Sequence, residues 1–78
     1  MNATQLRMAR AALGWGVRDL AARAGTTPNT ISRIENGGDA KQSTLDKLRE
    51  TLENAGIIFV PSNGAGPGVR LPKNQAAS

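Results

Sequence analysis

Apolar side chains recur three and four residues apart over the first 56 positions, which is the repeat of helices that bury one face. The first predicted helix begins after Asn2 and ends at Gly14. Asn2 and Gln5 have the spacing of a capping box, in which each side chain bonds the backbone of the other residue. One face of this helix carries Leu6, Ala9, Arg10 and Leu13. The only tryptophan, Trp15, follows it and is expected to pack on the core.

Two short helices separated by a glycine come next. The second helix is predicted over residues 17–24 and ends at Gly25. The third has a stronger start signal, because Thr27 is a good cap and Pro28 takes the first helical position, where its missing N–H costs nothing. The sequence "NGG" at 36–38 ends it. The inward-facing positions of both helices are Leu20, Ala21, Ala24, Ile31 and Ile34.

A fourth helix follows a polar connection. We expect Ser43 to open it, with Asp46 three residues later completing a weaker capping box, and Gly56 to close it. Its core stripe is Leu45, Leu48 and Leu52. The first 56 residues are therefore predicted to form one helical domain.

The pattern changes after Gly56. "IIFV" at 57–60 has the β-branched and aromatic composition of a strand, and "VRL" at 69–71 is a second short strand candidate. Residues 57–71 are predicted to form a β-hairpin or strand pair, and 72–78 a flexible polar tail. The "GAGPG" between the strands is interpreted as a turn, because no Lys-Ser/Thr pair and no helix follow it as in a phosphate-binding loop.

The amino-acid composition excludes several kinds of chemical site. The chain has no Cys and no His, which excludes disulfides, the usual zinc sites and nucleophiles activated by histidine. Its six acidic residues are scattered, so we predict no metal site, no cofactor and no enzymatic activity. No run is long and apolar enough to span a bilayer and no secretory segment opens the chain, so we expect a cytoplasmic protein. The net charge of +4 fits an anionic partner, although it also serves solubility alone.

The outer face of the third helix has an unusual set of side chains. With Ile31 and Ile34 inward, the outer positions are Asn29, Arg33 and Asn36, flanked by Pro28, Ser32 and Thr30. Arg, Asn and Ser are side chains that bond base edges in DNA. An ordinary solvated face more often carries Glu and Lys in charge pairs, and this face has neither. The spacing of Ala21, Gly25 and the two isoleucines is that of a helix-turn-helix, whose second helix enters the DNA major groove.

The segment "QLRMARAALGWGVRDLAARAGTTPNTISRIENG", with "TLDKL" after it, resembles the phage repressor and Cro type of helix-turn-helix, also called the xenobiotic-response-element (XRE) type. The resemblance covers about residues 4–56 and rests on several features together, "LG-W", "DLA--AG", "TISRIENG" and "TLDKL". It implies a mainly α fold, a lambda-repressor-like domain of four to five helices, here followed by the short hairpin. It also implies a regulator of transcription that binds double-stranded DNA.

The resemblance assigns roles to particular residues. Those expected to read bases are Pro28, Asn29, Ser32 and Arg33. Those expected to contact phosphates are Val17, Arg18, Thr27, Thr30 and Lys41. Val17 stands where members often carry Gln, and it cannot donate a side-chain bond, so phosphate contact there falls to backbone N–H groups or to Arg18. Arg18 and Lys41 could equally be solvated charges. Arg10 and Glu35 match a structural ion pair between the first and third helices.

A homodimer is expected, because one such module reads only a few base pairs and two modules read a palindromic operator. Both faces of the predicted strand are apolar, and an isolated hairpin leaves an open edge. The predicted interface residues are Ile57, Ile58, Phe59, Val60, Val69 and Leu71. The alternative is a hairpin folded back on the helices of its own chain. Arg70 could face DNA or solvent.

The sequence thus predicts a sequence-specific transcriptional regulator, and more specifically a repressor that binds double-stranded DNA as a homodimer at the nucleoid. The alternative is an antitoxin-like or other protein-interaction module whose DNA binding is secondary. RNA binding is disfavoured because Trp15 and Phe59 are the only aromatic residues, too few for base stacking.

Overall fold

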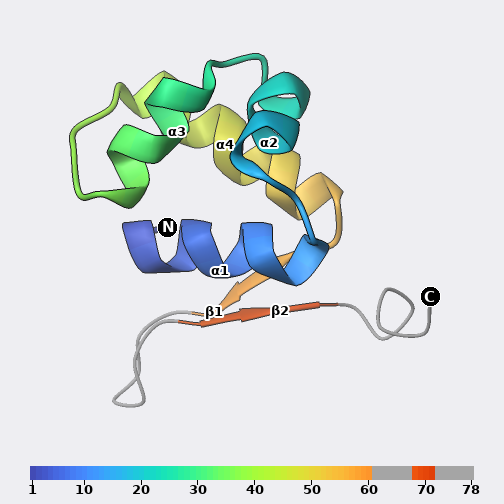
Figure 1. Ribbon diagram of the computed structural model, residues 1–78. Coiled ribbons are helices and arrows are strands. Elements are labelled where there is room, and N and C mark those ends of the chain that lie inside the picture. The colour runs from blue at the N-terminus through green and yellow to red at the C-terminus, as the bar shows by residue number, and fades with distance from the viewer. Residues whose placement is uncertain (61–67, 72–78) are drawn as a thin grey trace.

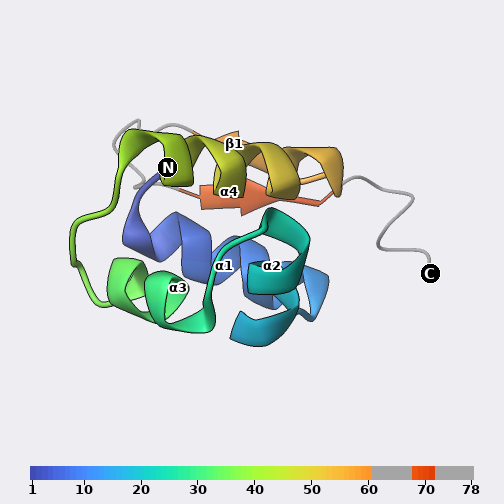
Figure 2. The same cartoon turned by 90° about the horizontal axis from the view of Figure 1, so that it is seen from above.

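Four helices and a two-stranded antiparallel sheet make up the computed structural model, which describes residues 1–60 and 68–71. The helices are α1 (Ala3–Leu13), α2 (Val17–Ala24), α3 (Pro28–Glu35) and α4 (Gln42–Asn54), and the strands are β1 (Ile58–Val60) and β2 (Gly68–Arg70). In Figure 1, α1 lies between the hairpin on one side and α2 and α3 on the other. Seen from above, α2 and α3 lie to one side of α1 and α4 to the other (Figure 2). The mainly α fold with a terminal strand pair is confirmed.

The ends of α1 follow the predicted signals. The Asn2 side chain accepts from the N–H of Gln5 at 2.8 Å, and the Gln5 side chain accepts from the N–H of Asn2 at 3.1 Å. Gly14 ends the helix with a φ of 70°, a left-handed conformation in which glycine has no steric penalty. The capping box and the glycine stop predicted for this helix are both confirmed.

Helices α2 and α3 pack closely around the turn at Gly25. Gly25 has a φ of 71°, and the N–H of Thr26 donates to the carbonyl oxygen of Ala21 at 3.0 Å. Because Ala21 is small and buried, α3 can approach α2 at this point. The core is formed by Leu6, Ala9, Leu20, Ala21, Ala24, Ile31, Ile34, Leu48, Leu52 and Ile57. Trp15 packs against this core from the side, and the guanidinium of Arg23 lies 4.4 Å from the centre of its ring.

The predicted start of α4 was wrong. The helix begins at Gln42, with Lys41 at the N-cap position and no side-chain capping bond, so Ser43 lies inside the helix. The amide of Gln42 donates to the Asp46 carboxylate at 2.9 Å, one turn further on. The Asp46 carboxylate, which the predicted capping box needed for the backbone N–H of Ser43, is thus bonded to Gln42 instead. Ala40 packs against the core, so the chain turns into the helix directly after it.

The hairpin folds back on the helices of its own chain. Strand β1 pairs with β2 so that Phe59 is opposite Val69 and Ile58 is opposite Arg70. Phe59, Val69 and Leu71 pack against the core, and Ile57 belongs to it, whereas Ile58 is 55% exposed on the outer face. Val60 is partly buried. The inner face of the hairpin is therefore covered by the helices of its own chain. This arrangement is the one predicted from the sequence as the alternative to burial of the hairpin in a dimer interface. Residues 64–67 of the predicted "GAGPG" turn and the 72–78 tail lie outside the described residues, whereas Gly68, the last residue of that turn, begins β2.

The side chain of Gln5 connects the hairpin to α1. Its amide nitrogen donates to the carbonyl oxygen of Val60 at 3.0 Å and to that of Gly68 at 3.2 Å, one on each strand. Its amide oxygen accepts the capping-box hydrogen bond from Asn2. The residue is only 6% exposed, and both polar atoms of its side chain are hydrogen-bonded. A buried polar group that is fully bonded costs little and fixes one arrangement of its partners. Gln5 therefore sets where the hairpin lies on α1.

Candidate nucleic-acid interface

The first turn of α3 is ordered by two threonines. The Thr27 hydroxyl accepts from the N–H of Thr30 at 3.2 Å, and the two hydroxyl oxygens lie 2.8 Å apart. Pro28 occupies the first helical position. The two threonines predicted to contact phosphates thus already bond each other, which uses one of their two hydroxyl hydrogens and leaves the other free to donate to a phosphate oxygen. The N-terminal end of α3 is therefore capped by side-chain hydrogen bonds rather than frayed.

The outer face of α3 is open to solvent. Ile31 and Ile34 hold the helix in the core, while Asn29, Ser32, Arg33 and Asn36 are exposed and Pro28 is partly buried. Within the described parts of the chain, Arg33 takes part in no ion pair. Its five donors, and the amides and hydroxyl beside it, are therefore available to a ligand. This mixture of donors and acceptors is suited to hydrogen bonding with the edges of DNA bases, and it differs from the charged residues usual on a solvated helix face.

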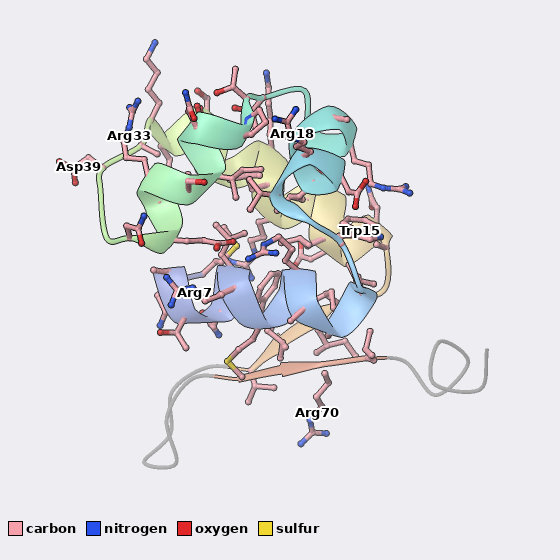
Figure 3. The ribbon with its side chains drawn as sticks, in the orientation of Figure 1. Arg7, Trp15, Arg18, Arg33, Asp39 and Arg70 are labelled. Atoms are coloured by element: carbon pink, nitrogen blue, oxygen red, sulfur yellow. The ribbon has the colours of Figure 1, made fainter. Side chains whose placement is uncertain are left out.

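The basic side chains divide between the two sides of the molecule. Arg18, exposed on α2, and Arg33 on α3 lie on the side away from the hairpin, whereas Arg70 on β2 points in the opposite direction (Figure 3). Lys41 is exposed at the start of α4, directly after the loop that follows α3. A duplex lying on α3 would thus meet Arg18 before it could meet Arg70. The Arg70 side chain therefore faces away from α3, which favours a contact with solvent over a contact with DNA bound at α3.

The start of α2 offers less to a phosphate than the resemblance implies. The Val17 side chain packs against the core and contributes no polar group. The N–H of Gly16 donates to the Asp19 carboxylate at 2.9 Å, which places a negative charge at the positive end of this helix. Any phosphate contact by Val17 must use its backbone N–H beside that carboxylate. Arg18 is therefore the stronger candidate on α2.

An ion-pair network ties α3 to α1. The Glu35 carboxylate accepts from Arg10 through Nε at 2.8 Å and Nη2 at 3.0 Å, a two-pronged contact. Arg10 also donates to the carbonyl oxygen of Trp15 at 3.2 Å. The hydrogen bonds that Arg10 donates to Glu35, together with the negative charge of that carboxylate, raise the pKa of Arg10, although burial of the guanidinium lowers it. The ion pair implied by the resemblance is present, and it holds the C-terminal end of α3 against the core.

Arg7 adds a second contact that sequence reasoning missed. Its Nη2 donates to the backbone carbonyl oxygen of Glu35 at 2.6 Å, and its Nε lies 3.7 Å from the Glu35 carboxylate. A cation at the last carbonyls of a helix is favourable, since those groups lack helical partners. Arg7 precedes Arg10 by one turn on the same predicted helix, and that spacing was the available signal.

Other kinds of site find no support in the described residues. These residues hold no group of three or more side chains of the types that bind metal ions. None of the helices within 1–60 has the length and apolar character needed to cross a membrane. What the described surface does present is the polar and basic outer face of α3.

Comparison with known proteins agrees with this geometry. A helix-turn-helix family model matches residues 6–54, which is more than half of the chain. The matched segment starts within α1 and ends at the last residue of α4, so it includes most of α1 and all of α2, α3 and α4, and it leaves out the hairpin. A search of curated proteins finds no match to the chain.

Proposed function

This chain belongs to the XRE-type helix-turn-helix family of DNA-binding regulators, and from that premise we propose that it is a transcriptional repressor that binds a palindromic operator as a homodimer. The observation that carries this proposal is the exposed face of α3, with Asn29, Ser32 and Arg33 open to solvent on a helix anchored by two buried isoleucines. In this mode Arg33 reads guanine, Asn29 reads adenine and Ser32 adds a further base contact. Pro28 contacts a thymine methyl group or sets the helix start.

Phosphate contacts position the module and supply most of its salt-dependent affinity. We assign them to the exposed cations Arg18 and Lys41, with Thr27, Thr30 and the backbone N–H of Val17 as uncharged partners. Repression needs nothing beyond occupancy, since a protein bound across a promoter excludes other proteins from it.

The placement of the hairpin decides which kind of dimer is compatible with DNA. The hairpin and α3 lie on opposite sides of α1 (Figure 1). If two copies stacked through the outer faces of their hairpins, their α3 helices would point in opposite directions and could not enter one duplex. If the hairpins instead pair edge to edge around a two-fold axis perpendicular to the sheet, both α3 helices face the same way. We therefore propose an edge-paired dimer with a continuous four-stranded sheet.

Two observations support edge pairing. The described sheet has two strands, so each strand has one edge with no neighbouring strand, and such edges pair readily with a second copy. The Cα atoms extend 31 Å along each of the two longer principal axes, so two modules placed side by side along such an axis would have centres separated by a distance comparable to the ~34 Å of one DNA turn.

Selection of binding sites from a randomised double-stranded DNA pool tests the proposal. We expect a two-fold palindrome whose half-site centres lie about one turn apart. Transcription in vitro from a promoter that contains the selected site should fall as the protein is added. If no sequence is enriched and binding is only salt-sensitive, the base-reading roles are wrong. The exposed outer face of the hairpin around Ile58 would then favour a protein-interaction module.

A further inference from the structure

Two adjacent glycines end α3, and they are required for different reasons. Gly37 has a φ of 88°, and a Cβ atom there would have nothing within 4 Å. Gly38 does not have a positive φ, but a Cβ atom there would lie 2.6 Å from Cγ of Arg33 and 2.9 Å from the Arg33 carbonyl oxygen. Gly37 therefore meets the need for a left-handed backbone, while Gly38 meets a need for space.

The hydrogen bonds around these glycines identify the motif. The N–H of Gly37 donates to the carbonyl oxygen of Ile34 at 3.0 Å, and the N–H of Gly38 donates to that of Arg33 at 2.8 Å. This pair of bonds closes a Schellman motif. In that motif the residue at the position of Gly38 often packs an apolar side chain on the helix at the position of Arg33. Here glycine leaves that space free, and the methylene stem of Arg33 lies against the Gly38 backbone instead.

We propose that Gly38 is a positioning residue for Arg33, and that it sets the direction in which the guanidinium leaves α3. This inference rests on the proposed base-reading role of Arg33. A long side chain in a helix has only two favourable χ1 rotamers, so excluding one of them redirects the whole guanidinium. A stem held in place before binding also loses less rotamer freedom when the guanidinium meets a base. A side chain at position 38 would displace Cγ of Arg33 and change the direction in which its guanidinium points.

Substitution of each glycine in the full chain separates the two roles. Gly38→Ala should remove discrimination at the one base pair whose preference Arg33→Ala also removes, a loss of roughly 5- to 150-fold for a lost two-pronged contact. In an Arg33→Ala background, Gly38→Ala should change discrimination no further. Gly37→Ala is the matched control, because it strains the backbone but meets no side chain. It should lower thermal stability and leave every base preference unchanged.

The proposal is overturned if Gly38→Ala retains full discrimination, weakens all sites equally, or acts independently of Arg33. A second measurement on the unmodified protein covers the case in which Gly38→Ala does not fold. Nuclear Overhauser contacts between the γ-methylene protons of Arg33 and the α protons of Gly38 are expected, and their absence overturns the proposal. If the unmodified protein selects no DNA sequence, the proposed function fails by that result, while the Overhauser contacts still decide whether Gly38 places the stem of Arg33.

Discussion

The carboxylate of Glu35, near the C-terminal end of α3, receives both prongs of the Arg10 guanidinium from α1, at 2.8 and 3.0 Å. The Glu35 side chain is 7% exposed and that of Arg10 is 21% exposed, so the pair is largely shielded from water. Apart from its buried isoleucines, α3 is held to α1 by this ion pair and by the hydrogen bond from Arg7 to the Glu35 carbonyl oxygen. We therefore expect the Arg10–Glu35 pair to fix the position of the proposed base-reading face of α3.

Removing one member of this pair should destabilise the protein strongly. Glu35→Ala leaves a shielded guanidinium without its partner, and we expect a loss of about 3 kcal/mol in the free energy of unfolding. Replacing both members, as Arg10→Met with Glu35→Leu, should recover most of that loss, because two apolar side chains leave no unpaired charge. Denaturant unfolding of the two variants measures both values.

The chain contains its own control for that experiment. Arg49 and Glu53 on α4 also pair, at 3.2 Å, but their side chains are 52% and 47% exposed. Glu53→Ala should cost no more than about 0.5 kcal/mol. Because Glu35 raises the pKa of Arg10, the contribution of the charged Arg10 to the Arg10–Glu35 pair is fully present at neutral pH and is lost in strongly alkaline solution as Arg10 deprotonates. Equal losses for Glu35→Ala and Glu53→Ala would show that the network does not anchor α3.

Gln5→Glu should release the hairpin from α1. The substitution keeps the size of the side chain and its capping oxygen, but it replaces two donated hydrogen bonds with a carboxylate facing the carbonyl oxygens of Val60 and Gly68. We expect a loss of about 2–3 kcal/mol in the stability of the hairpin, with faster amide exchange in β1 and β2. Thr4→Ala, at an exposed neighbouring position, should leave exchange unchanged. Slow exchange retained in Gln5→Glu would mean that apolar packing alone places the hairpin.

The features that could be predicted from the sequence are local ones. The capping box at Asn2 and Gln5, the stop at Gly25 and the Thr27–Pro28 start each depend on residues within four positions of one another. Helix periodicity then identified the buried faces, because a 3.6-residue repeat fixes which side chains point inward. The exposed face of α3 followed from the same repeat once two isoleucines were placed in the core.

The features that escaped prediction depend on tertiary contacts. Gln5 bonds residues 55 and 63 positions away, and nothing in its local pattern distinguishes this role from capping alone. The space required at Gly38 exists only because Arg33 lies against it, and "NGG" by itself indicates only a helix stop. The helix α4 begins at Gln42 rather than at Ser43, and the Asp46 carboxylate of the predicted capping box instead accepts a hydrogen bond from the Gln42 side chain. Long-range contacts of this kind require the fold before they can be recognised.

Three basic side chains should affect DNA binding in three distinguishable ways. Arg33→Ala should cost about 1–3 kcal/mol and relax preference at one position of each half-site. Lys41→Ala should weaken all sequences alike and reduce the slope of log affinity against log salt by about 1. Arg70→Ala removes the same charge on the opposite side of the molecule and should change neither quantity (Figure 3). A salt slope reduced by Arg70→Ala would mean that the hairpin also contacts DNA.

The outer face of the hairpin distinguishes the two possible dimers. Ile58 is 55% exposed and lies opposite Arg70 on that face. In a dimer stacked through the outer faces, Ile58→Glu would bury two carboxylates against each other and dissociate the complex. In the edge-paired dimer that we propose, the position stays in solvent, so Ile58→Glu should leave the sedimentation-equilibrium dimer and operator affinity nearly unchanged. A stable dimer that Ile58→Glu abolishes would contradict edge pairing, and a protein that remains monomeric on its operator would contradict the homodimer itself.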